Sequence, residues 1–120
     1  MSYFCIMSVR TKETCNKHII PVKDALDVLG GRWKLQLLIH LSFGPRRFNQ
    51  LAKELAPITD RTLSKELKSL EANKVISRTE YDAFPPVVEY RITPHGESLF
   101  AVISELGNWG RAHRKMIMDK

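Results

Sequence analysis

Two short apolar repeats with helical spacing, separated by a turn of four residues, occupy the middle of the chain. The first spans residues 48–55, and the second places leucines at positions 63, 67 and 70. Apolar residues at this spacing form one stripe along an α-helix, so each repeat predicts a helix with one buried face. Pro57 closes the first helix, and Thr59 or Asp60 can accept the free amide hydrogens of the second, which reaches Asn73. The pattern predicts a helix-turn-helix.

Two further helices are expected before this motif. The first is predicted to begin at Pro21, because proline suits the first helical turn, and to end at the glycine pair 30–31. The second is expected to run from Arg32 to the Phe-Gly-Pro sequence at 43–45, followed by a short extended piece at 45–47. Its apolar residues should face the core: Trp33, Leu37, Leu38 and Leu41.

After the motif the apolar period changes from helical to alternating. Residues 75–81 and 87–92 read as two extended strands, and the segment 82–86 between them contains two adjacent prolines. Prolines at these positions exclude a central strand and favour the tip of a hairpin. We therefore expect a small wing, and an α+β, mostly α, winged helix-turn-helix fold with two or three strands.

The last segment predicts one long helix. Thr93 is suited to cap it, Pro94 to its first turn, and an apolar stripe continues to Ile117. A helix of about 24 residues would span roughly 36 Å, more than a domain this small can cover. We expect its distal part to pack against a second copy through Leu106, Trp109, His113 and Ile117.

The 120 residues and the 43% hydrophobic content suit one folded domain, expected at residues 15–120 behind a flexible tail at 1–14. No run of about 18 apolar residues is present, and the N-terminus lacks the features of a secretory signal. We expect a cytoplasmic protein that spans no membrane.

Basic residues gather on the second helix of the motif. On a helical wheel Arg61, Lys65 and Lys68 lie opposite the leucines, with Thr62 and Ser64 at the margins. A helix fits the major groove of DNA, and Arg or Lys can donate hydrogen bonds to guanine. The alternative is an ordinary solvated face. The formal net charge of +6 favours polyanions without identifying one.

Further cations precede and follow this helix. Arg46 and Arg47 lie just before the first helix of the motif, where a DNA phosphate can be held. Arg78 lies in the predicted wing and is either a groove or phosphate contact or a solvent-facing strand residue. The wing tip has no Lys or Arg, so we expect its contribution to specificity to be modest.

Several separated segments together resemble HxlR-type winged helix-turn-helix regulators, relatives of the MarR group. The resemblance covers residues 15 to 115 and rests on PVKDALDVLGGRWK (21–34), GPRRFNQL (44–51), ITDRTLSKEL (58–67), VVEY (87–90), TPHG (93–96) and NWG (108–110).

The resemblance implies a transcription regulator that binds a palindromic DNA operator as a homodimer held by its N- and C-terminal helices, and we expect repression. It places four residues in the recognition helix, namely Arg61, Thr62, Ser64 and Lys65, and it places Arg46 and Asn49 at the start of the supporting helix.

The two cysteines leave open how the protein is regulated. Some members of the family sense oxidants through a cysteine directly before the proline of the first helix, but here Ile20 precedes Pro21 and the nearest thiol is Cys15. Cys15 is a candidate redox switch or an incidental thiol, and Cys5 is a weaker candidate. The effector is therefore an unknown small molecule or an oxidant.

Other function classes have little support. Cys15 and His18 form at most half a metal site, so we expect no metal and no cofactor. No catalytic motif is present, which argues against an enzyme. No aromatic stacking platform for RNA is evident on the strands. A winged-helix module that binds protein instead of DNA is the main alternative.

Overall fold

The computed structural model describes the backbone of residues 12–119 and the side chains of residues 17–119. The chain divides into two compact units, Met1–Gly31 and Arg32–Lys120. Helix α2 of the first unit spans Lys12–Leu29. Its first turn overlaps the expected tail of residues 1–14, whose remainder lies outside the described residues.

The expected helix start at Pro21 is wrong, because Pro21 lies inside α2. Helix α2 continues upstream of Pro21 to Lys12, and residues 19–27 are exposed. A proline inside a helix leaves the carbonyl four residues earlier, here that of Lys17, without its amide donor. On an exposed helix water can satisfy that carbonyl, which reduces the penalty.

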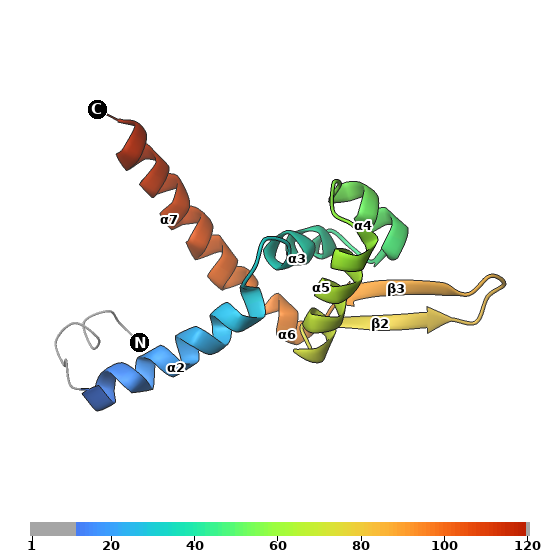
Figure 1. The fold of residues 1–120 in the computed structure, drawn as a ribbon, viewed down its shortest axis with the longest axis horizontal. Coiled ribbons are helices and arrows are strands. Elements are labelled where there is room, and N and C mark those ends of the chain that lie inside the picture. Colours follow the sequence, from blue (N-terminus) through green and yellow to red (C-terminus); the bar gives the residue numbers. More distant parts are fainter. Residues whose placement is uncertain (1–11, 120) are drawn as a thin grey trace. The chain divides into compact units, whose positions relative to one another are not determined.

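The second unit confirms the winged helix-turn-helix fold (Figure 1). Three helices come first, with a two-residue strand between them, and a hairpin and two more helices follow. In chain order they are α3 (Lys34–Ser42), β1 (Arg46–Arg47), α4 (Phe48–Glu54), α5 (Asp60–Ala72), β2 (Ile76–Tyr81), β3 (Val87–Ile92), α6 (Pro94–Glu97) and α7 (Phe100–Met118).

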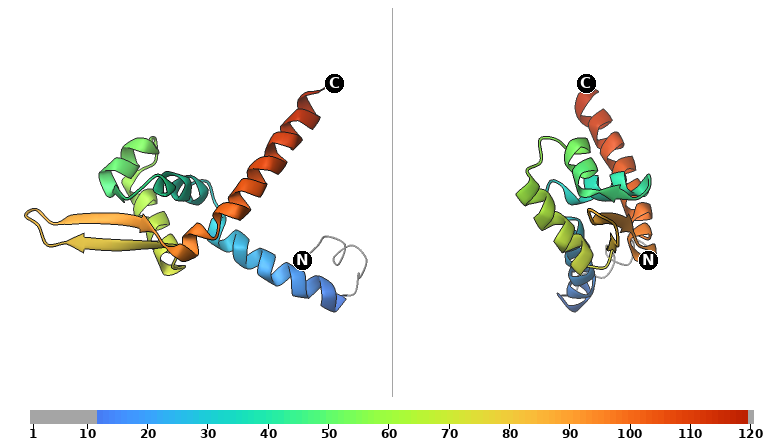
Figure 2. Two further views of the ribbon diagram at one scale, coloured as in Figure 1. Left: turned by 180° about the vertical axis from the view of Figure 1, so that it is seen from behind. Right: turned by 90° about the vertical axis from the view of Figure 1, so that its right-hand side faces the viewer.

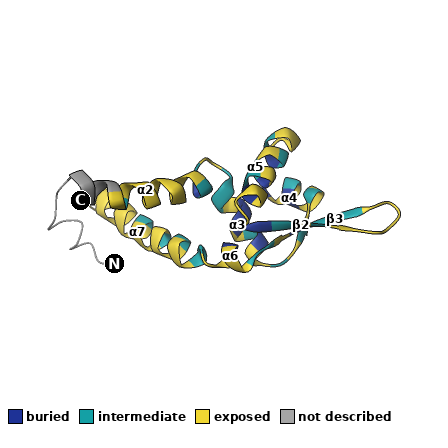
Figure 3. Ribbon diagram, turned by 90° about the horizontal axis from the view of Figure 1, so that it is seen from below, coloured by how far each residue is buried: buried dark blue, intermediate teal, exposed yellow. Residues whose placement is uncertain are grey.

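The core of this unit consists mainly of leucines from α3, α4 and α5 (Figure 3). Side chains exposed by 3% or less there are Leu37, Leu38, Leu41, Leu51, Leu55, Leu63, Leu67, Leu70, Val75 and Ile76. Full burial of one such side chain stabilises the folded state by about 1.5–3 kcal/mol. The leucine repeats therefore fix which face of α4 and of α5 is turned inward.

The sheet has three antiparallel strands in the order β1-β3-β2. Ile76 pairs with Ile92 and Tyr81 with Val87, while β1 covers only Tyr90 and Glu89 of β3. The hairpin of β2 and β3 projects past α4 and α5 as a wing (Figure 1 and Figure 2). Residues 82–86 form its tip, as the two prolines indicated.

The expected long C-terminal helix is confirmed as α7, but it does not begin at Pro94, because residues 94–97 form the separate helix α6 and Ser98 and Leu99 lie between the two. The Ser98 amide donates to the carbonyls of Pro94 and His95, and the Leu99 amide donates to that of Gly96. The Ser98 hydroxyl also donates to the His95 carbonyl. The bonds from Ser98 to His95 and from Leu99 to Gly96 join residues three apart, which is the tighter 3₁₀ pattern that interrupts the α-helix here.

Within residues 12–119, none of the helices combines the length and the apolar character that crossing a membrane requires.

Candidate nucleic-acid interface

Helix α5 presents a basic face on the side away from the core. Arg61, Lys65 and Lys68 are exposed, whereas the three leucines of the helix are buried. Thr62 and Ser64 are half-buried at the margins of this face. Among the described side chains, none of the three cations forms an ion pair. They are therefore available to bases or phosphates of a nucleic acid.

Glu66 is held away from this basic face. Its Oε2 lies 3.8 Å from Nζ of Lys34 at the start of α3, and the two side chains are 15% and 16% exposed. Such a pair contributes at most about 1 kcal/mol to stability. The ion pair also means that the positive charge of Lys34 compensates the negative charge of Glu66 on the flank of the basic face.

Thr59 shapes the start of α5. It has an extended backbone, and its Oγ1 accepts a hydrogen bond of 3.1 Å from the Thr62 amide. The Thr59 hydroxyl also donates to Oγ1 of Thr62 at 2.9 Å. This cap satisfies an amide hydrogen of the first turn and orients Thr62, a residue of the predicted recognition set.

The other end of α5 is tied to the beginning of α6. Lys74 has a positive φ of 63° and follows the C-cap residue Asn73. The Thr93 hydroxyl donates to the Lys74 carbonyl at 2.7 Å and accepts a bond of 3.0 Å from the Gly96 amide. Thr93 thus caps α6 and fixes the turn that ends α5.

The two arginines of β1 differ in their surroundings. Arg46 donates from Nε to both carboxylate oxygens of Glu54 and from its guanidinium to the carbonyls of Gly44 and Pro45. Nδ1 of His40 lies 3.2 Å from the same carboxylate. The guanidinium of Arg46 therefore links β1 to α4 and has few donors left for a phosphate.

Arg47, in contrast, is exposed and forms no ion pair with the described residues. Its backbone amide donates to Oε1 of Gln50 at 2.8 Å, which fixes the first turn of α4. Asn49 is exposed on the same turn. Of the residues predicted here, Arg47 and Asn49 are the ones free to hold a phosphate.

The arginines of the wing are paired with carboxylates. Arg78 lies 3.9 Å from Glu80, and both are well exposed. Arg91 donates to Glu89 at 2.9 Å and to the Tyr81 hydroxyl at 3.2 Å. These hydrogen bonds, first to Tyr81 and then to Glu89, raise the pKa of Arg91 above its usual value. Sequence reasoning singled out Arg78 and missed the Arg91 cluster.

Glu54 was also missed. It lies eight positions after Arg46 and fourteen after His40, spacings that match no local helical pair. Only the packing of α3, β1 and α4 brings the three residues together. Nothing in the sequence alone indicated that contact.

The residues predicted to form a dimer interface lie on α7, none of whose residues is buried. Leu106 is 50% exposed, Trp109 67% and Ile117 64%. The rings of Trp109 and His113 stack at a centroid distance of 4.7 Å. The chain thus exposes a contiguous apolar stripe in this unit.

Cys5 and Cys15 lie outside the residues whose side chains the structure describes. Among the described residues, no cluster of three or more His, Cys, Asp or Glu side chains is arranged to hold a metal ion.

Comparison with known proteins gives a consistent result. A family model described as HxlR-like helix-turn-helix matches residues 28–118. The chain is 37% identical over 102 residues to the HTH-type transcriptional regulator YybR of Bacillus subtilis (strain 168). The aligned residues make up 85% of this chain and 82% of YybR.

Two solved structures are also similar. The redox regulator HypR in its reduced form has a TM-score of 0.76 and 36% identity, over 83% of this chain and 99% of that one. The reduced form of the transcriptional regulator YodB from B. subtilis has a TM-score of 0.69 and 32% identity, over 72% of this chain and 85% of that one.

Proposed function

Because the chain belongs to the HxlR-like helix-turn-helix family of DNA-binding transcriptional regulators, we propose that it recognises a specific palindromic operator as a homodimer and represses transcription in the cytoplasm. The observation that carries the proposal is the basic face of α5, on which Arg61, Lys65 and Lys68 are exposed and unpaired among the described residues.

The chemistry of this face supports base reading. Arg61 and Thr62 lie in the first turn of α5, the part of a recognition helix that reaches base edges in the major groove. Arg and Lys side chains donate to guanine O6 and N7, and the Thr hydroxyl can bond to several bases. Arg47 and Asn49, exposed at the start of α4, suit the phosphates that fix the position of α5 on the duplex.

The apolar stripe of α7 supports a homodimer. Leu106, Trp109 and Ile117 are all at least half exposed to water. Burial of this apolar surface against a second copy would stabilise the dimer. A two-fold dimer places two recognition helices in major grooves one helical turn apart, about 34–36 Å. This geometry requires an operator with two inverted half-sites, and occupancy of that operator excludes polymerase from an overlapping promoter.

Selection of bound sites from a random duplex library with the purified protein tests the proposal. We expect an inverted repeat to emerge and to bind at least about a thousandfold more tightly than scrambled DNA at physiological salt. Transcription in vitro from a promoter that contains this repeat should fall when the protein is added. Weak binding without sequence preference contradicts the proposal and favours a protein-interaction role.

We also propose that an oxidant is the effector, with Cys15 as the sensing thiol. Support comes from the similarity to HypR, a redox regulator, and from the two cysteines of this chain. Diamide takes two electrons and two protons from a pair of thiols, here Cys15 of each protomer, to form one disulfide; it should change operator affinity in wild-type protein and in Cys5→Ser but not in Cys15→Ser. An unchanged response in Cys15→Ser excludes this role of Cys15.

A further inference from the structure

Two hollows flank the end of the wing and share Pro86. One, of about 280 Å³, is lined by Arg47, Phe48 and Asn49 on one side and by residues 85–88 of the wing on the other. The second, of about 270 Å³, is lined by residues 80–83 and Pro86. Both are open and at or below the lower end of the volumes that enclose a small-molecule ligand. Such open hollows can bind a chemical group of a larger partner at the protein surface.

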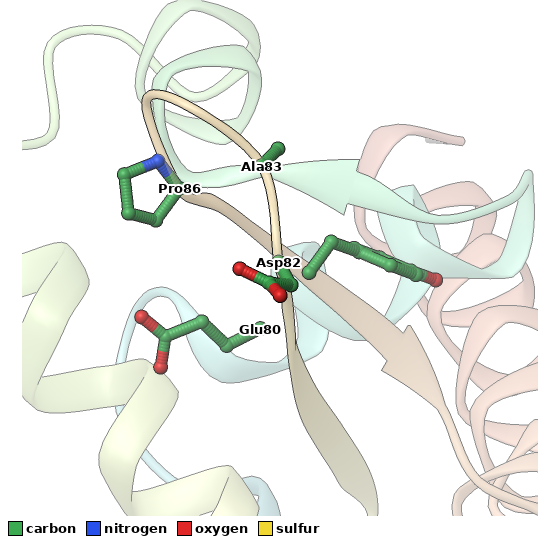
Figure 4. Close-up of a pocket in the computed structure, with 5 residues that line it drawn as sticks. Glu80, Asp82, Ala83 and Pro86 are labelled. Atoms are coloured by element: carbon green, nitrogen blue, oxygen red, sulfur yellow. The ribbon is translucent and has the colours of Figure 1, made fainter.

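The two hollows differ in charge. The first is lined by the cationic residue Arg47 and the polar residue Asn49, and none of its lining residues has a carboxylate. The second contains the carboxylates of Glu80 and Asp82 and has no Lys or Arg (Figure 4). A polyanion is attracted to the first hollow and repelled by the second. The charge of the first hollow therefore suits a phosphate, and that of the second does not.

Resting on the proposed function, we propose that the hollow beside the start of α4 receives one phosphodiester of the bound duplex together with its deoxyribose. Arg47 and Asn49 hold the phosphate oxygens. The rings of Pro85 and Pro86 and the side chain of Val87 contact the apolar face of the sugar. The acidic hollow faces away from the DNA.

Three observations support this arrangement. Arg47 and Asn49 are exposed, and Arg47 forms no ion pair among the described residues. Strand β1 ends at the pairing of Arg47 with Glu89, which leaves the edge of β3 open at Val87 and Val88. The wing tip at residues 82–86 has no Lys or Arg, so it can contribute contact area to the DNA backbone but no positive charge. A wing contact of this kind should add affinity that depends little on salt.

Two matched lysine substitutions test which side of the wing meets DNA. Val87→Lys adds a cation to the first hollow, and Ala83→Lys adds the same cation to the acidic one. Val87→Lys should bind the selected operator and scrambled DNA at least about fivefold more tightly at low salt and steepen the slope of log K against log salt by about one. Ala83→Lys should stay within about twofold of wild type. A gain of affinity cannot result from misfolding.

A methylphosphonate scan of the operator locates the phosphate. One neutralised phosphate per half-site should weaken wild-type binding at least about fivefold and leave Arg47→Ala unchanged, because that variant has already lost the contact. Equal effects of the two lysine variants, or no phosphate that distinguishes Arg47→Ala from wild type, overturn the inference. If wild type still prefers the operator over scrambled DNA in that case, the proposed function stands and only this hollow is excluded.

Discussion

On the proposed function, Arg61 and Lys65 are the side chains on which base reading should depend most directly. Replacing either with Ala should cost roughly 1–3 kcal/mol of binding to the selected operator and relax the preference at one position of each half-site. The reason is that a hydrogen bond to a base edge is lost while the phosphate contacts remain. Fluorescence anisotropy with operator and scrambled duplexes measures both effects.

Lys115→Ala is the matched control for these variants, since it removes one exposed positive charge from α7 instead of α5. It should leave the ratio of specific to non-specific affinity unchanged. If Arg61→Ala, Lys65→Ala and Lys115→Ala all behave alike, the α5 face does not read bases.

Glu54 limits how many N–H donors of the Arg46 guanidinium are available to a DNA phosphate. In Glu54→Ala the guanidinium loses its carboxylate partner and one negative charge disappears near the start of α4. We expect tighter binding to operator and scrambled DNA alike, by a few fold at low salt, and a loss of stability below about 1 kcal/mol. Glu97→Ala, which removes an exposed acid from α6, should change neither quantity. Weaker binding by Glu54→Ala would mean that the ion pair of Arg46 with Glu54 positions α4 for DNA binding, and that freeing the Arg46 guanidinium adds no DNA contact.

Helix α6 is a short element seated closely on the end of α5. A Cβ added at Gly96 would collide with the Val75 carbonyl and lie 2.7 Å from Cγ1 of Ile92. Because the backbone must shift to relieve this overlap, Gly96→Ala should destabilise the protein by about 1–3 kcal/mol. Urea denaturation followed by circular dichroism measures the change. Glu97→Ala at the next position should stay within about 0.5 kcal/mol, and equal stability of both variants refutes the close approach.

The elements differ in how well their sequence predicts them. The leucines of α4 and α5 predicted both helices, and the change of period at Val75 predicted the wing, because burial of one face imposes its spacing on the residues. Thr59 was one of two predicted cap residues, with Asp60, because a capping interaction is local; the structure shows Thr59 as the cap. The start of α2 was misplaced, since an exposed helix tolerates Pro21 in its interior. The interruption at Ser98 depends on local hydrogen bonds, while the apolar residues on both sides of it keep helical spacing. The spacing of apolar residues therefore could not predict it.

The candidate site follows the same division. Exposure of Arg61, Lys65 and Lys68 follows from their positions opposite the leucines, so the sequence predicted it. Sequence reasoning treated Arg46 and Arg47 as a pair, but Glu54 occupies one and leaves the other exposed. Contacts of this kind join residues from different elements and depend on the packing of the whole unit.

At the scale of the whole molecule we expect a dimer with a mass near twice the 13.8 kDa of one chain. Trp109→Glu places a charge in the apolar stripe of α7, so it should yield monomers at micromolar concentration and weaken operator binding, because two half-sites are no longer held together. Light scattering combined with size exclusion gives the mass.

Ser104→Glu is the control for this variant, since position 104 lies on the side of α7 opposite Leu106, Trp109 and His113. It should remain dimeric. A wild-type monomer at micromolar concentration, or a dimer that survives Trp109→Glu and breaks with Ser104→Glu, contradicts this interface.

The step at Ser98 and Leu99 separates the part of the chain that would read a half-site from the part that would join two half-sites. On the proposed function, substitutions on α5 should change the sequence of each half-site, whereas substitutions at this step should redirect α7 and change the number of base pairs between the two half-sites. Relatives built in this way would then differ in operator spacing while keeping the same half-site sequence. Two such paralogues in one genome would not bind each other's operators, even if their recognition helices were identical.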